Sequence, residues 1–135
     1  MKLLVDANVV LDAALARQPW VLDAARLIRE IESGKVTAYI AGHTVTTVYY
    51  ILRKHLGSGG AALGVSNMLR LFEVVPVEKH DFAQASLLAL SDYEDAVQAV
   101  CALKAGADFI VTRNEKDFSG LSIPAWAPSR VLAIL

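Results

Sequence analysis

Short, continuously apolar runs recur along this chain, and helical patterns separate them. The four runs are Lys2–Asp6, Val36–Ala41, Val74–Val77 and Phe109–Thr112. Runs of this length and composition are typical of strands that are buried on both faces of a parallel sheet. Because parallel strands need crossover connections, the alternation predicts a three-layer α/β/α sandwich with a mostly parallel central sheet of four or five strands.

Helical periodicity and turn residues predict the connecting segments. The closing segment offers a short edge strand near Ile123 and a final helix after Pro128. Of the other expected helices, one starts at Asn8 and one runs from Pro19 to a stop at Gly34. The next three cover Thr44–Leu56 up to Gly57, Ala61–Phe72 and Asp81–Leu90. The last runs from Ser91-Asp92-Tyr93-Glu94 to Lys104, before Gly106.

Length and composition indicate a single folded domain over residues 1–135. Hydrophobic residues make up 55% of the chain and charged residues 20%, which argues against disorder. A chain of this length can bury a core without disulfides or structural metals. The high apolar content also suggests either helices buried on several sides or a sizeable apolar subunit interface, so a homodimer is a reasonable expectation.

Cysteine content and hydropathy favour the reducing cytoplasm. The single cysteine, Cys101, cannot form an internal disulfide, and its apolar surroundings predict a small buried side chain. The N-terminus resembles a signal peptide superficially, but Asp6, Asn8 and Asp12 interrupt its apolar segment, so we expect it to be retained. The uncharged stretch Ala38–Leu52 is shorter than the ~18 apolar residues of a spanning helix, and no membrane span is predicted.

Oxygen-bearing side chains follow the first and fourth predicted strands. Asp6 ends the first strand, Asn114 and Asp117 follow the fourth, and Asp92 and Asp95 open a helix. In such sheets the carboxyl ends of the strands form the ligand site, so these groups are expected to converge. Two charges ~4 Å apart repel by about 4 kcal/mol at an effective dielectric of ~20, so the cluster needs protons or a cation. Oxygen ligands without histidine or cysteine favour Mg²⁺ or Mn²⁺.

Each of these residues also has a purely structural interpretation. Asp6 is placed to cap the following helix, and Asp92 to cap its own helix with Asp95 in the first turn. Asn114 is suited to starting a turn, and Asp117 to pairing with Arg113. For Asp92 we favour the cap, and for Asp95 the metal.

Four segments together resemble a known family. They are VDANVVLD at the start, SDYEDAVQAVCALKAGAD, IVTRNEKDF, and a terminal segment with a proline before the final helix. This combination resembles the PIN domains, metal-dependent ribonucleases that include the VapC-type toxins of bacterial toxin–antitoxin pairs. The resemblance implies cleavage of RNA, a small antitoxin as partner, and a catalytic set of Asp6, Asp95, Asn114 and Asp117. Of these, Asp6, Asp95 and Asp117 would bind the metal, and the supporting residues would be Asn8, Thr47, Asp92 and Thr112.

The chain departs from the family pattern at Thr47. The family commonly has a glutamate there, in a pattern like AEVYYVL, whereas this chain reads TTVYYIL. Asn114 is likewise an amide where many members carry a carboxylate. Fewer charges remain to hold a second cation, so we expect one well-held metal and a second that binds weakly unless Asp92 or Glu94 compensates.

Cations and aromatic residues are candidates for RNA contacts. The formal net charge of −1 means that RNA must be held by a local patch, and the candidate residues are Arg113, Lys116, Arg53, Lys54 and His55. Each alone also fits ordinary surface charge. Tyr49 and Tyr50 are suited to base stacking, although helical spacing puts at least one in the core. The spacing of His43, His55 and His80 does not suggest a ligand set.

Two other functional classes remain as alternatives. The first is a non-catalytic RNA-binding or protein-interaction module that kept the fold without the acid at position 47. The second is a phosphatase of the haloacid dehalogenase type, which also uses an acid after the first strand. That chemistry needs a second aspartate two residues later, where this chain has Asn8.

Overall fold

The apolar runs form one parallel sheet in the computed structural model, which describes residues 1–135. The sheet order is β3-β2-β1-β4-β5, and every neighbouring pair is parallel. The chain therefore winds outward from β1 to β3 and then returns to place β4 on the other side of β1, and the parallel sheet that the sequence predicted is confirmed. The strands are β1 (Lys2–Val5), β2 (Thr37–Ala41), β3 (Glu73–Val75), β4 (Phe109–Val111) and β5 (Ala125–Trp126).

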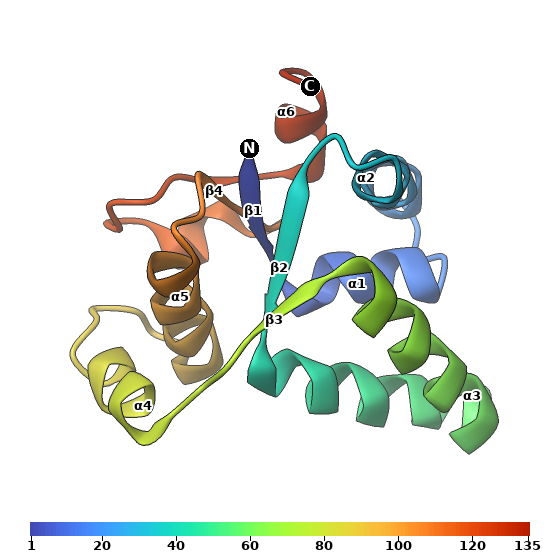
Figure 1. Ribbon diagram of the computed structural model, residues 1–135, viewed down its shortest axis with the longest axis horizontal. Helices are drawn as coiled ribbons and strands as arrows, with labels where there is room; N and C mark the ends of the chain where they lie inside the picture. The colour runs from blue at the N-terminus through green and yellow to red at the C-terminus, as the bar shows by residue number, and fades with distance from the viewer.

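Helices cover both faces of this sheet and complete the predicted three layers (Figure 1). Helices α1, α2, α3 and α6 pack on one face, and α4 and α5 on the other. The helices are α1 (Ala7–Ala14), α2 (Val21–Glu32), α3 (Gly42–Leu71), α4 (Lys79–Ala85), α5 (Tyr93–Ala105) and α6 (Pro128–Leu132), with a 3₁₀ turn η1 (Glu115–Phe118).

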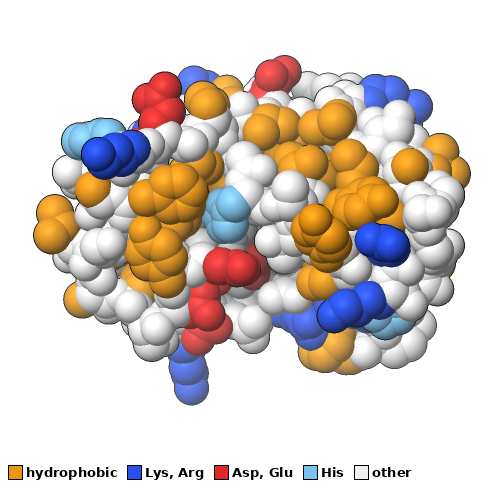
Figure 2. Space-filling model, turned by 90° about the horizontal axis from the view of Figure 1, so that it is seen from below, with side chains coloured by type: hydrophobic (Ala, Val, Ile, Leu, Met, Phe, Trp, Pro, Cys, Tyr) orange, Lys and Arg blue, Asp and Glu red, His pale blue; other side chains and the backbone are white.

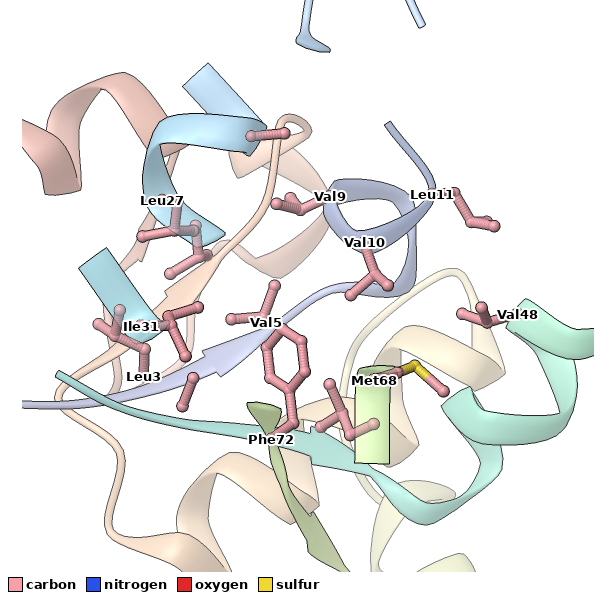
Figure 3. Close-up of a cluster of buried hydrophobic side chains, with 14 of the residues drawn as sticks. Leu3, Val5, Val9, Val10, Leu11, Leu27, Ile31, Val48, Met68 and Phe72 are labelled. Atoms are coloured by element: carbon pink, nitrogen blue, oxygen red, sulfur yellow. The ribbon is translucent and has the colours of Figure 1, made fainter. Parts of the chain in front are cut away.

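Strand β1 supplies side chains to both cores. Leu3 and Val5 belong to the cluster beneath α1, α2 and α3, whereas Leu4 belongs to the cluster beneath α5. Figure 3 shows Val5 and Phe72 at the centre of the first cluster, between side chains of α1 and α2. Fully burying one such side chain contributes about 1.5–3 kcal/mol, so a strand that is apolar on both faces holds the three layers together.

The main departure from the sequence prediction is in α3. The two expected helices, Thr44–Leu56 and Ala61–Phe72, are parts of one element that bends at Gly57. The residues expected to form a turn, Ser58 to Gly60, are helical. At Gly57 φ is +73° and ψ is 176°, a combination that only glycine adopts without strain, and this one residue reverses the chain direction in place of a longer loop.

Other element boundaries shift by a few residues. Strand β3 ends before Pro76, which has no N–H to donate to a ladder. Helix α4 ends at Ala85 rather than Leu90. The backbone hydrogen bonds that follow join residues three apart instead of four, as from the Leu88 N–H to the Ala85 carbonyl. Helix α2 begins at Val21, after Pro19, and the edge strand lies at Ala125–Trp126 instead of near Ile123.

Expectations about burial hold where the structure tests them. Cys101 is fully buried. Tyr49 packs against the core, whereas Tyr50 is 60% exposed. None of the helices combines the length and the apolar character that crossing a bilayer requires.

The bend in α3 leads to a stability prediction. Gly57→Ala should lower the free energy of unfolding by about 1–3 kcal/mol, because alanine is strained at this φ and ψ. Gly59→Ala is the matched control, since Gly59 is helical with open space where a Cβ would lie, and it should be neutral or stabilising. Urea denaturation followed by circular dichroism measures both, and equal effects would contradict this account of the bend.

Candidate active site

A polar cleft of about 290 Å³ opens at the carboxyl ends of the central strands. Seven of the site residues expected from the sequence line it: Asp6, Asn8, Thr47, Asp92, Asp95, Asn114 and Asp117. Figure 2 looks at this face and shows acidic side chains gathered in a central hollow beside a histidine. The groups come from the end of β1, from α1 and α3, from the start of α5 and from the segment after β4, so the fold brings together residues that are distant in sequence.

The Asp6 carboxylate is the most buried acid of the cleft. Asp6 is 4% exposed, and its Oδ2 accepts a hydrogen bond of 2.9 Å from the hydroxyl of Thr112. Its Oδ1 accepts a bond of 3.1 Å from Nε2 of Gln98. Asp6 occupies the N-cap position of α1, but its side chain makes no capping bond to the helix. Two donors instead hold the carboxylate at the mouth of the sheet.

Gln98 is a site residue that the sequence analysis missed. Its Nε2 also lies 3.4 Å from Oδ1 of Asp95, so one amide group bridges two carboxylates from different elements. Both N–H groups of that amide are thereby used. Its Oε1 is buried without a protein partner. The only signal in the sequence is a polar residue inside the apolar run of α5.

Asp92 and Asp95 take different positions at the start of α5. Asp92 is the N-cap, and its Oδ1 accepts from the Asp95 N–H at 3.0 Å, which confirms the capping interpretation. Asp95 has no such role, and its side chain faces the cleft. Burial, followed by the charges of Asp6, Asp92 and Asp117, raises the pKa of Asp95 to about 7. The acids therefore crowd one another electrostatically, as expected from the sequence.

The segment after β4 is tied to Asp6 through Thr112. The Thr112 hydroxyl is fully buried, donates to Asp6 and accepts a bond of 3.1 Å from the Asn114 N–H. The Asn114 carbonyl in turn accepts from the Asp117 N–H at 3.0 Å, inside the turn that ends at Phe118. A single hydroxyl thus links the acid of β1 to the loop that carries Asn114 and Asp117.

Helix α3 forms the opposite, uncharged wall of the cleft. Thr47 lies at the position where an acid was expected, and its hydroxyl donates to the His43 carbonyl of its own helix at 3.2 Å. His43 and Thr44 also line the cleft. Burial lowers the pKa of His43, and the nearby Glu94 opposes that change. The histidine spacing gave no sign of this placement.

The donor set fits a hard divalent cation, although the side chains do not form a ready-made cage. No three acidic, histidine or cysteine side chains lie close enough together to hold a metal ion as they stand. Carboxylate and amide oxygens nevertheless surround the cleft, and burial together with the neighbouring acids raises the pKa of Asp95. A divalent cation bound in the cleft would supply the missing positive charge, and its coordination would draw these oxygens together.

The candidate RNA-binding cations lie outside this cleft. Arg113 turns away from Asp117, so their expected pairing is wrong. Its Nε lies 3.4 Å from Oδ2 of the buried Asp12, and its guanidinium stacks over Trp20 at 3.7 Å. The remaining candidates are exposed and do not line the cleft: Arg53, Lys54, His55 and Lys116.

The crowding of Asp95 predicts a pH-dependent loss of stability in metal-free protein. Its folded pKa of about 7 lies above the ordinary aspartate value of 3.8, so the penalty is absent below pH 3.8, grows as pH rises and is complete above pH 7. Asp95→Asn should therefore be about 1–2 kcal/mol more stable than the parent at pH 8 in chelator, a magnitude reduced for partial exposure. The two proteins should be nearly equal at pH 4. Urea denaturation at both pH values tests this, and an equal difference at both would contradict it.

Comparisons with known proteins agree with this geometry. The sequence profile of the PIN domain matches residues 2–116. The chain is 29% identical to Ribonuclease VapC1 of Aquifex aeolicus (strain VF5) over 122 residues, which cover 87% of this chain and 83% of the relative.

Solved structures of low sequence identity share the fold. The Mycobacterium tuberculosis VapC20 toxin, described as cleaving the sarcin-ricin loop, superposes with a TM-score of 0.70 at 16% identity and covers 88% of this chain and 95% of its own. FitAcB from Neisseria gonorrhoeae gives 0.69 at 17% identity, covering 94% and 98%. By its sequence profile and its five-stranded parallel fold, the chain belongs to the PIN domain family.

Proposed function

We propose that this chain is a metal-dependent endoribonuclease that hydrolyses RNA phosphodiester bonds and acts as the toxin of a toxin–antitoxin pair. The observation that carries the proposal is the convergence of Asp6, Asp95 and Asp117 on one cleft of a PIN fold. The relative at 29% identity is named a ribonuclease, and several proteins of similar fold are toxins or toxin–antitoxin complexes, which supports both parts of the proposal.

Asp6, Asp95 and Asp117 would hold Mg²⁺ or Mn²⁺, because oxygen ligands suit these ions. When bound, the ion supplies an activated water and neutralises charge on the phosphate. The chain's own residues prepare this arrangement. Thr112 and Gln98 fix the direction of the Asp6 oxygens, and Asp92 fixes the first turn of α5 from which Asp95 projects. Asn8 and Asn114 add neutral polar groups to the wall of the cleft.

The remaining parts of the proposal concern partners and location. Exposed Arg53, Lys54 and Lys116 would position the RNA backbone and offset its repulsion by the acidic cleft. Arg113 would contribute less, because its charge is already paired with Asp12. A small antitoxin would bind the protein, and we propose a homodimer in the cytoplasm.

A non-catalytic PIN-fold module that binds RNA or protein is the alternative that one observation favours. The Thr47 hydroxyl is bonded to its own helix, so nothing at that position replaces the family's carboxylate. The phosphatase alternative is not retained, because the Asn8 amide cannot donate a proton as a general acid.

Removing the most buried acid tests the nuclease proposal. Asp6→Asn should reduce cleavage of a structured RNA in Mn²⁺ by more than ~100-fold, since even the loss of a residue that supports a ligand costs ~10–100-fold. Chelator should abolish cleavage by the parent protein. Glu73→Gln, which removes an exposed charge outside the cleft, is the control and should cleave normally. Cleavage that survives both Asp6→Asn and chelation would reject a metal-dependent mechanism and favour the alternative.

Restoring an acid at position 47 tests the expected metal stoichiometry. Thr47→Glu should raise Mn²⁺ affinity by about tenfold or add a second binding event in calorimetry, because it supplies a charged ligand from the uncharged wall. Thr46→Glu is the matched control, since Thr46 is exposed and its hydroxyl bonds to the same His43 carbonyl. Equal gains in both variants would show a general charge effect instead of a site at position 47.

A further inference from the structure

The two walls of the cleft differ in charge, and the uncharged wall has donors that no protein group uses. Five acidic residues line the cleft, and none of them comes from α3. The first turns of α3 instead contribute His43, Thr44 and Thr47. Thr47 is occupied by the bond to its own helix, which leaves His43 and Thr44.

The His43 ring has one nitrogen available to a ligand. Its Nδ1 is buried without a partner, whereas Nε2 is not among the buried unpaired atoms; the Glu94 backbone lies near enough to bond to the ring, so a ligand at Nε2 would compete with it. A buried N–H without an acceptor is costly, so the favoured neutral tautomer carries its proton on Nε2. Burial lowers the pKa of His43, which keeps the ring neutral at pH 7 even though Glu94 opposes the shift. His43 therefore presents an N–H donor to the cleft.

Thr44 gives a second, independent observation on the same turn. It is 1% exposed and lines the cleft, yet its hydroxyl has no hydrogen-bond partner. Buried polar groups in folded proteins are nearly always paired, so an unpaired hydroxyl beside a cleft calls for a ligand or an ordered water. An acceptor-rich ligand would satisfy both side chains.

We propose that His43 is an RNA-contacting residue, donating from Nε2 to a non-bridging phosphate oxygen, and that Thr44 completes this phosphate subsite on α3. This inference rests on the proposed function, because it assigns the second wall of the same cleft. A phosphodiester would then lie between the cation held by the acids and the neutral donors of α3.

A neutral donor suits this position better than an acid or a cation. A glutamate at position 47 would repel the phosphate unless a second ion were bound beside it. A lysine or arginine there would pair with Glu94 or Asp95 across the cleft. An imidazole N–H and a hydroxyl bind phosphate oxygens without neutralising the acids that the metal needs.

Histidine NMR tests the contact directly, because the chain has three histidines. In protein with isotope-labelled histidine and Ca²⁺, a short single-stranded oligouridylate should shift the His43 ring resonances and show the proton on Nε2. His80, which is exposed and outside the cleft, should not move, and His55 reports separately on the Arg53–Lys54 patch. An unmoved His43 in a complex that fluorescence anisotropy shows to be formed, or no complex at all, would overturn the inference.

Variants separate an RNA contact from a metal ligand or a structural role. His43→Ala should raise KM for RNA about tenfold with kcat nearly unchanged, as expected for a charge-assisted bond made equally in the ground and transition states. His43→Gln keeps an N–H donor and should recover part of the loss. Mn²⁺ affinity should stay unchanged in both variants, and His80→Ala should match the parent.

The possible failures are distinguishable. Loss of Mn²⁺ binding in His43→Ala would make His43 a metal ligand and overturn the inference, as would an unchanged KM. If the parent protein does not cleave RNA at all while RNA still shifts His43, the nuclease proposal fails and the phosphate contact stands.

Discussion

The crowding of carboxylates at one edge of a parallel sheet is the constraint on which the rest of the site depends. Asp6 lies at the end of β1 and is almost fully buried, and Asp95 lies close enough for its own ionisation to be hindered by Asp6. Two donors, Thr112 and Gln98, partly compensate the charge of Asp6. These two donors do not neutralise the charge of all the acids in the cleft, so electrostatic repulsion destabilises the folded state when no cation is bound. Binding a divalent ion would remove that penalty, and stability and metal loading are therefore linked.

The segment after β4 is held from both sides, which positions Asn114 and Asp117. Thr112 points toward Asp6, and the next residue, Arg113, points to the other side and packs between Asp12 and Trp20. Asp12 is 1% exposed, and burial raises its pKa despite the charges of Arg113 and Arg17. Alternation of side chains along an extended backbone explains why neighbouring residues serve two different environments. Arg113 is thus better explained as a support for the loop than as a surface cation.

The sequence predicted the sheet and the acids because both leave strong local signals. Each strand is a short apolar run; Asp6 ends the first run, and Asp117 lies in the polar segment after the fourth. The bend at Gly57 was interpreted as a loop, because three further small residues follow it and their helical conformation depends on packing between the halves of α3. Gln98 and His43 left no such signal. Whether Gln98 and His43 face the cleft depends on how α5 and α3 are rotated about their helix axes. Tertiary packing fixes that rotation.

The threonine at position 47 changes the electrostatics of the cleft as well as its ligand count. A further carboxylate a few ångströms from the others would add about 4 kcal/mol of repulsion per close pair at an effective dielectric of ~20. Such a protein would lose part of its stability without a second cation, because stability margins are only about 5–15 kcal/mol. With Thr47 bonded to its own helix, α3 contributes no charge and the acids need less compensation. Under the proposed function, the exchange would remove a metal ligand but leave one wall of the cleft free to meet a polyanion, and that asymmetry would orient a bound phosphate.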